Sequence, residues 1–133
     1  MADTLSTKAR ELIARPILAS LTTLGKDGSP QVTPLWIDQD GDDLLFNTAR
    51  GRVKARHMEN DPRVAVSVVD PDDPYNVVAV RGTVTDVTTE GADAGIDALA
   101  KKYLGVDSYP MRRADEVRIT VRIRPDRILM QSA

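Results

Sequence analysis

The sequence has no cysteine and only one histidine among its 133 residues. The absence of cysteine excludes disulfide bonds and thiolate chemistry, and one histidine excludes a His-based zinc cluster, so we expect no metal site. Aromatic residues make up only 4% of the chain. The single tryptophan, Trp36, and the single phenylalanine, Phe46, are therefore individually informative.

Long apolar runs are also missing. No stretch approaches the roughly 20 apolar residues that cross a bilayer, and the first residues lack the basic region and apolar run of a signal peptide. We therefore predict a cytoplasmic protein without a membrane partner. The formal net charge is −2, so the molecule as a whole should repel nucleic acid.

Several familiar catalytic motifs are absent as well. The sequence contains no G-x-G-x-x-G, no Walker loop, no H-E-x-x-H and no G-x-S-x-G. Its acidic residues cluster in turns, where Asp is favoured for local reasons, which gives no support for catalysis by paired carboxylates. His57 lies among cations, and we expect a lone surface histidine. The sequence predicts no catalytic side chain.

Positive charge is concentrated in residues 47–57, called the basic segment below. Four cations lie within seven residues of it: Arg50, Arg52, Lys54 and Arg56. Such a local excess, in a chain of slightly negative net charge, indicates either a pocket for an anion or a solvated basic helix. For an arbitrary run of charges the solvated helix is the more common case.

The residues around these cations are compatible with an anion pocket. Strand-like residues precede the basic segment, and 52–60 has a helix-compatible composition, with Asn47 or Thr48 available as a cap. A strand, a tight turn and a helix would direct free backbone N–H groups and the positive end of the helix dipole at one point. That arrangement binds phosphate.

Periodicity predicts a mainly β protein with short accessory helices. Apolar residues at helical spacing predict one helix over about 5–15, capped by Asp3 or Thr4, and another over 92–103 that ends at Gly105. The predicted strands are 17–24, 31–37, 44–48, 63–69, 76–89, 117–124 and 126–131. Six or seven mostly antiparallel strands with such helices indicate a closed or partly closed β-barrel, formed by one domain over residues 1–133.

Two residues inside predicted strands carry further information. We expect the first three strands to form a meander, and Pro34 in the second cannot donate to a ladder, so that strand must lie at an edge or be interrupted. The backbone around Thr33, Leu35 and Trp36 would then be free for a ligand. The alternative is that Pro34 protects an edge and Trp36 belongs to the core. Gly82 predicts a bulge or sharp bend in its strand.

An anion site beside an interrupted strand and an aromatic residue suits a flat, phosphorylated cofactor that brings its own reactivity. The order of these pieces resembles the flavin and deazaflavin split-barrel oxidoreductases, the superfamily that includes pyridoxamine 5′-phosphate oxidase. The resemblance covers roughly residues 15–90. The segments that carry it are 17–23, 27–36, 45–48, 52–56, 60–64 and 78–82.

The resemblance implies an FMN-binding-type split barrel and a set of cofactor contacts. The cofactor ring would lie against Val32, Thr33, Pro34, Leu35 and Trp36, held largely by backbone groups. The residues implied near the cofactor phosphate are Asn47, Thr48, Arg52, Val53 and Lys54. Members are typically homodimers with cofactor sites at the interface, so Tyr75, Asn76 and Val77 would reach the partner's site.

The C-terminal residues 124–133 lack the Trp and the Arg-x-His substrate motif of pyridoxamine phosphate oxidase. This short form is similar to the branch that uses the deazaflavin F420. That likeness implies an F420-dependent oxidoreductase, which transfers a hydride from reduced F420 to a conjugated or heteroaromatic small molecule such as a biliverdin-like tetrapyrrole. Four arginines are candidates to screen the polyanionic tail of F420: Arg50, Arg56, Arg112 and Arg113.

Two other functions fit the same residues. One is an FMN-dependent flavin reductase or oxidase with the same fold. The other is a non-catalytic module that binds flavin, haem or a deazaflavin.

Overall fold

A computed structural model describes residues 3–132, which form seven strands and three helices. The helices are α1 (Thr7–Ala14), α2 (Val53–Asn60) and α3 (Ala92–Leu104). The strands are β1 (Ala19–Leu24), β2 (Pro30–Leu35), β3 (Asp38–Asp40), β4 (Asp43–Ala49), β5 (Arg63–Asp70), β6 (Asp73–Thr88) and β7 (Arg118–Met130). The predicted mainly β class is confirmed.

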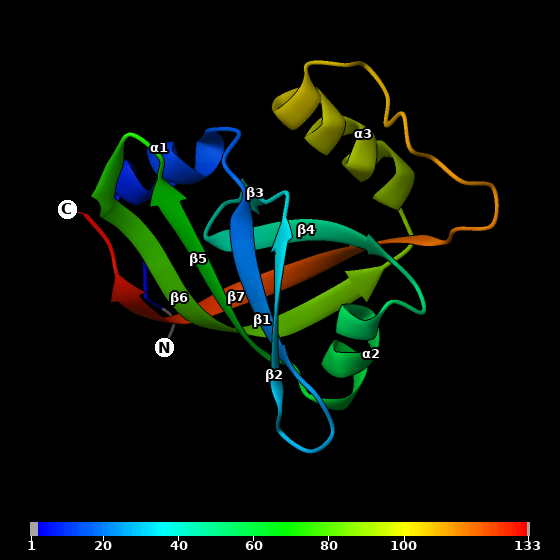
Figure 1. Ribbon diagram of the computed structural model, residues 1–133, viewed down its shortest axis with the longest axis horizontal. Coiled ribbons are helices and arrows are strands. Elements are labelled where there is room, and N and C mark those ends of the chain that lie inside the picture. The colour runs from blue at the N-terminus through cyan, green and yellow to red at the C-terminus, as the bar shows by residue number, and fades with distance from the viewer. Residues whose placement is uncertain (1–2, 133) are drawn as a thin grey trace.

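All strands belong to one antiparallel sheet in the order β2-β1-β5-β6-β7-β4-β3. The sheet curves but does not close, because no pairing joins β2 to β3 within the described residues. Figure 1 shows α1 and α3 near one end of the curved sheet and α2 near the other. The inner face holds the core, where Phe46, Val121 and Ile123 have no measurable exposure.

The predicted meander of the first three strands is wrong. β1 and β2 form the expected hairpin, but β2 has no second neighbour, and β4 pairs with β3 and with the distant β7. The chain leaves the ladder after Leu35 and crosses to the opposite edge of the sheet. Ile37 is only 1% exposed on this crossing, so burial of an apolar side chain accompanies the change of edge.

Pro34 lies on an edge strand, as predicted. It faces Ser20 of β1, and no strand of the described residues 3–132 lies on its other side. A missing N–H therefore leaves no ladder partner unsatisfied there.

The two C-terminal strands expected from the sequence are one continuous strand, β7. Pro125 interrupts neither β7 nor the sheet, because it faces Gly82 of β6 at a register shift between Arg81 and Gly82. The bulge predicted at Gly82 is thus confirmed. Val117, the first residue of the predicted strand 117–124, instead precedes β7 and is 47% exposed.

Two predicted helix caps are wrong. Ser6, rather than Asp3 or Thr4, caps α1 by accepting a hydrogen bond from the Ala9 N–H at 3.1 Å. Asp3 instead accepts from the backbone N–H of Ile128, so its carboxylate ties the N-terminal segment to β7. The predicted end of α3 at Gly105 is confirmed, with a φ of 73° that favours glycine.

Helix α2 has no side-chain cap. Its N-cap position is Arg52, and Asn47, predicted as a cap, instead donates to the carbonyl of Ala92. Gly51, with a φ of 86°, makes the tight turn between β4 and α2. Because no side chain satisfies the first turn, its backbone N–H groups stay available for another acceptor.

His57 is not a free surface residue. Its Nδ1 shares a hydrogen bond with Oγ1 of the buried Thr23 at 2.9 Å, and its ring is half-buried. This contact fastens α2 to β1.

Within residues 3–132, no helix has the length and apolar character needed to cross a bilayer.

Gly82 provides a test of the bend between β6 and β7. A Cβ at this position would lie 2.6 Å from Cγ2 of Ile123 and 2.8 Å from the carbonyl oxygen of Arg124. Backbone atoms must move to relieve the second contact, so we expect Gly82→Ala to lower the free energy of unfolding by about 1–3 kcal/mol in urea denaturation. Ser67→Ala on the neighbouring β5 is the control and should change it by less than about 0.5 kcal/mol. Equal stabilities for the two variants would contradict the tight bend.

Candidate functional site

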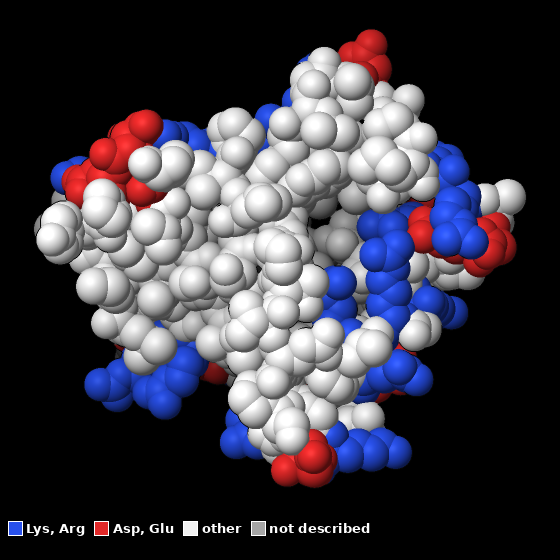
Figure 2. Space-filling view, viewed as in Figure 1, with Lys and Arg blue, Asp and Glu red and all other residues white. Residues whose placement is uncertain are grey.

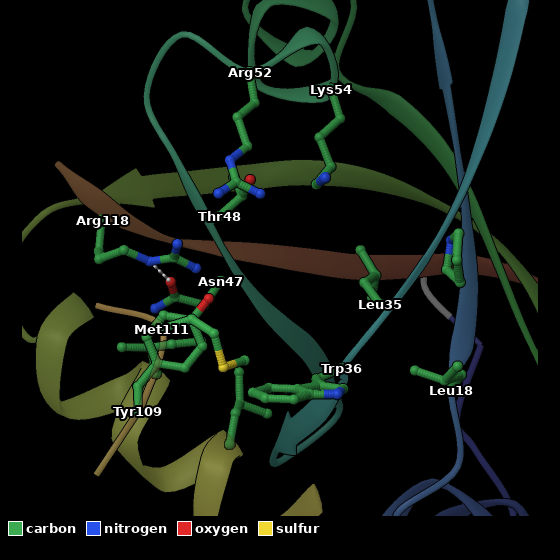
Figure 3. A pocket seen from close by; sticks show the side chains of 13 residues that line it. Leu18, Leu35, Trp36, Asn47, Thr48, Arg52, Lys54, Tyr109, Met111 and Arg118 are labelled. Atoms are coloured by element: carbon green, nitrogen blue, oxygen red, sulfur yellow. Dashed lines mark hydrogen bonds between the residues drawn. The ribbon is translucent and has the colours of Figure 1, made fainter. Parts of the chain in front are cut away.

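A pocket of about 240 Å³ opens between β2, β4, α2, α3 and the start of β7. Figure 3 shows its side chains, with cations from α2 at one end and aromatic residues at the other. The lining residues are Leu18, Pro34, Leu35, Trp36, Asn47, Thr48, Arg52, Lys54, Ile96, Leu99, Tyr109, Met111 and Arg118. None of them is acidic.

Arg52, Lys54 and Thr48 form the cationic end of the pocket. Lys54 is half-buried and makes no ion pair within residues 3–132. Burial, followed by the charges of Arg52 and Arg118, lowers the pKa of Lys54. The buried Thr48 Oγ1 has no hydrogen-bond partner in the described part of the chain. An unpaired hydroxyl beside a desolvated ammonium is a donor set suited to an oxyanion.

A carboxylate behind the lining holds two of the cations. Glu116 accepts from Arg52 Nη2 at 2.9 Å and from Arg118 Nη1 at 3.3 Å. Although burial opposes the effect, these two arginines hold the pKa of Glu116 below its usual value. Arg118 also donates from Nε to Asn47 Oδ1 at 2.8 Å, the bond drawn in Figure 3. The guanidinium groups are therefore fixed before any ligand arrives.

The other end of the pocket is aromatic. Trp36 stacks on Tyr103 at 5.4 Å between ring centroids and meets Tyr109 edge-on at 6.1 Å. Tyr103 in turn donates to the Ile17 carbonyl and accepts from the Ile37 N–H. Trp36 is half-buried and lines the pocket, so the alternative that it is simply a core residue is wrong. Trp36 and Tyr109 therefore give the pocket two aromatic surfaces at right angles, called the aromatic wall below, and Tyr103 stacks on the Trp36 ring.

The loop between α3 and β7 brings Tyr109 and Met111 to the pocket. Asp97 of α3 anchors this loop by accepting from the Tyr109 N–H at 2.8 Å and from Arg112 Nη2 at 2.6 Å. The Tyr109 N–H and the Arg112 charge hold the pKa of Asp97 below its usual value. One carboxylate thus fixes the position of this wall of the pocket.

The pocket brings together seven of the residues predicted for the cofactor site. They are Pro34, Leu35, Trp36, Asn47, Thr48, Arg52 and Lys54. Among the others, Val32 is 64% exposed on β2, Val53 is 42% exposed on α2, and Thr33 does not line the pocket.

Tyr75, Asn76 and Val77 lie on β6, outside this pocket. Their predicted role therefore depends on a second copy of the chain. Of the arginines considered for a cofactor tail, Arg112 pairs with Asp93 and Asp97, and Arg113 pairs with Asp115. Arg50 and Arg56 are exposed.

Six lining residues were not foreseen from the sequence: Leu18, Ile96, Leu99, Tyr109, Met111 and Arg118. Arg118 alternates with apolar residues along β7, a pattern typical of an outward-facing side chain. It is instead buried, with 6% of its side chain exposed. The only sequence signal was the neighbouring Glu116, an acid immediately before a basic strand.

Within residues 3–132, no group of three or more His, Cys, Asp or Glu side chains is placed to hold a metal ion.

Comparison with known proteins identifies the family. The family model described as pyridoxamine 5′-phosphate oxidase matches residues 5–132. The chain belongs to this family. A solved structure of an F420 reductase is 36% identical to it, covering 90% of this chain and 94% of that one, with a TM-score of 0.81. No curated protein matches significantly.

More distant solved structures share the fold. A conserved hypothetical protein from Mycobacterium tuberculosis is 20% identical over 96% of this chain and 84% of that chain, with a TM-score of 0.75. HupZ from Group A Streptococcus is 21% identical over 98% and 97% of the two chains, with a TM-score of 0.70. The predicted split barrel of the pyridoxamine 5′-phosphate oxidase family is confirmed.

Acidification should release the loop that Asp97 anchors. The pKa of Asp97 is lowered in the folded protein, so its contribution to loop order is present above the unfolded-state pKa of about 3.9 and is lost as pH falls through the lower folded-state value. Asp97→Ala should reproduce this loss at neutral pH. We expect faster hydrogen exchange of the Tyr109 amide in the variant. Asp93→Ala, which removes only one ion pair with Arg112, is the control, and equal protection in all three proteins would contradict the anchor.

Proposed function

We propose that this member of the pyridoxamine 5′-phosphate oxidase family is an F420-dependent oxidoreductase that reduces a conjugated or heteroaromatic small molecule. The observation that carries the proposal is the cationic end of the pocket beside the aromatic wall. The 36% identity to an F420 reductase over 90% of the chain supports the choice of a deazaflavin.

The residues present fit the phosphate of such a cofactor. Lys54 and Arg52 supply positive charge without a lining carboxylate, and Thr48 supplies an unpaired buried hydroxyl. The first turn of α2 adds backbone N–H groups that no side chain caps. Together they offer what a buried phosphate requires, which is neutralisation and several directed donors.

The opposite end fits a flat ring. Pro34, Leu35 and Trp36 come from the end of an edge strand, so backbone groups as well as an apolar surface face the pocket. A bound reduced deazaflavin would supply the hydride. The protein would orient the ring against this wall, neutralise the phosphate at Lys54, and exclude water with the loop that carries Tyr109 and Met111.

The substrate side of the site is open. Leu18 and Met111, which are 57% and 50% exposed, line the pocket. Apolar side chains at the mouth would favour an extended conjugated molecule, of which a biliverdin-like tetrapyrrole is one candidate.

FMN is the alternative cofactor, because a flavin and a deazaflavin present similar rings and both carry phosphate. A flavin reductase or oxidase would then be the function. A non-catalytic module that binds flavin, haem or deazaflavin is the third candidate. All three would use the same cationic pocket.

Fluorescence titration tests the cofactor assignment, because Trp36 is the only tryptophan and lines the pocket. We expect saturable quenching by oxidised F420, and weaker quenching by FMN. Lys54→Ala should weaken F420 binding by about tenfold or more, since a charge-assisted hydrogen bond contributes roughly 1.5–3 kcal/mol.

Lys101→Ala is the matched control, because Lys101 is exposed on α3 and does not line the pocket. Its affinity should equal that of the unaltered protein. Preference for FMN would assign the protein to the flavin branch. No quenching by either cofactor would refute both assignments, and binding without turnover of any acceptor would favour the binding module.

We further propose that the active form is a homodimer. Alternate residues of β1, β2, β5 and β6 present a broad, mostly uncharged surface, which Figure 2 shows beside the cations of the pocket and which includes the exposed Arg63 and Arg81. Its outward residues include Ser20, Thr22, Val32, Ala65, Ser67, Val69, Val77 and Ala79. A second copy on this surface would border the pocket, and Tyr75, which is 88% exposed, could then contact the partner's cofactor.

A charge placed on this surface should separate the protomers. We expect Val32→Asp to shift the mass measured by light scattering from dimer to monomer, because an unpaired carboxylate would be buried in the interface. Leu104→Asp is the control, since Leu104 is 48% exposed on α3 and away from this surface. A monomeric parent protein, or a dimeric Val32→Asp variant, would contradict the proposal.

A further inference from the structure

Arg118 is a buried cation at the start of β7, with only 6% of its side chain exposed. The little surface that it retains belongs to the pocket, where it is a lining residue. Figure 3 shows its guanidinium reaching from β7 toward the cavity, on the same side as Arg52. A buried guanidinium needs acceptors for its donors, or it costs free energy.

The protein satisfies only part of that need. Nε donates to Asn47 Oδ1 and Nη1 to Glu116 Oε2, while Nη2 has no acceptor among residues 3–132. The Tyr109 ring lies 5.3 Å from the guanidinium carbon, which fixes the plane of the group without using its N–H donors. Arg118 is therefore held in place with donor capacity left over.

The positive charges around Arg118 outnumber the negative ones. The charged groups that face it are Arg52, Lys54 and Glu116. Glu116 is the single acid and serves both arginines, so the four groups together carry a net charge of about +2 at neutral pH. An anion with one charge would leave part of this excess unpaired in a partly desolvated site.

We propose that Arg118 forms a second anion position beside Arg52, Lys54 and Thr48, so that the pocket selects a ligand carrying two neighbouring negative charges. This inference rests on the proposed function. The shared chemistry is a second anionic oxygen close to the first. It is supplied either by a phosphate monoester, as in FMN, or by a phosphodiester followed by a carboxylate, as in a deazaflavin with an acidic tail.

A purely structural Arg118 would tie β7 to Asn47 and Glu116 and have no preference for ligand charge. Two small probes separate the possibilities. Methyl phosphate carries close to two charges at neutral pH, because its second pKa is about 6, whereas dimethyl phosphate carries one. Their binding is measured at pH 7.5 from shifts of the Trp36 indole N–H resonance, without any cofactor.

We expect the unaltered protein to bind methyl phosphate about tenfold or more tightly than dimethyl phosphate. Arg118→Gln should lose that preference and bind dimethyl phosphate within about twofold of the unaltered protein. Lys54→Gln should weaken the binding of both probes. Arg118→Lys should keep part of the preference for methyl phosphate, because the positive charge remains. Arg113→Gln is the control, since Arg113 pairs with Asp115 on an exposed loop.

A preference that survives Arg118→Gln, or affinities for the two probes that are equal in the unaltered protein, would overturn the inference. So would failure of both probes to bind. If Arg118→Gln does not fold, the pH dependence of probe binding to the unaltered protein provides a second test. Lowering the pH from 7.5 to 5 should weaken the binding of methyl phosphate several-fold by protonating it, and should leave the binding of dimethyl phosphate unchanged. Parallel changes for both probes would count against a second anion position.

Titrations with FMN and F420 then identify the source of the second charge. The cofactor that loses affinity in Arg118→Gln is the one whose second anionic group Arg118 contacts. If the small probes behave as expected while neither cofactor quenches Trp36, the second anion position is supported and the proposed function fails. If F420 binds the unaltered protein and Arg118→Gln equally well, the function is supported and the second position fails.

Discussion

The long pairing of β7 with two other strands is the constraint on which the site depends. β7 pairs with β6 along one edge and with β4 along the other, and places Arg118 opposite Ala49 and Thr120 opposite Asn47. The bend at Gly82 lets one strand serve both halves of the sheet.

Electrostatics then gives the pocket its character. A guanidinium, a second guanidinium and an ammonium converge where a single carboxylate, Glu116, lies behind the lining. Burial, followed by the charges of Arg52 and Arg118, lowers the pKa of Lys54, so the ammonium is unfavourable there unless an anion pairs with it. An arrangement that is unfavourable without an anion and fixed by hydrogen bonds is pre-organised for binding one.

The parts predictable from sequence were those with a local physical cause. Pro34 predicted an edge strand, Gly82 predicted a bulge, and the basic segment predicted a cationic turn next to a strand. These features depend on residues close together in the chain, so a single sequence reveals them.

The wrong predictions concerned contacts between residues that are far apart in the sequence. Nothing local shows that β4 would pair with β7 rather than β2, since that choice depends on which buried faces meet across the whole sheet. The true partners of Asn47 are Ala92 and Arg118, 45 and 71 residues away, which is why it was misread as a cap. Arg118 alternates with apolar residues along its strand, as an outward-facing residue would. Its burial is explained only by its contacts with Glu116, Asn47 and Tyr109.

The choice of cofactor also depends on residues that are far apart in the sequence. Both FMN and F420 carry a phosphate, so Thr48, Arg52 and Lys54 of the basic segment would accept either one. If the ring is held mainly by backbone groups of the edge strand, as the family resemblance implies, those contacts would discriminate poorly between similar tricyclic rings. Under the proposals above, discrimination would come from groups outside the basic segment, namely the second anion position at Arg118 and the loop anchored by Asp97. Cofactor preference in this family should accordingly vary with β7 and the loop before it, even where the basic segment is unchanged.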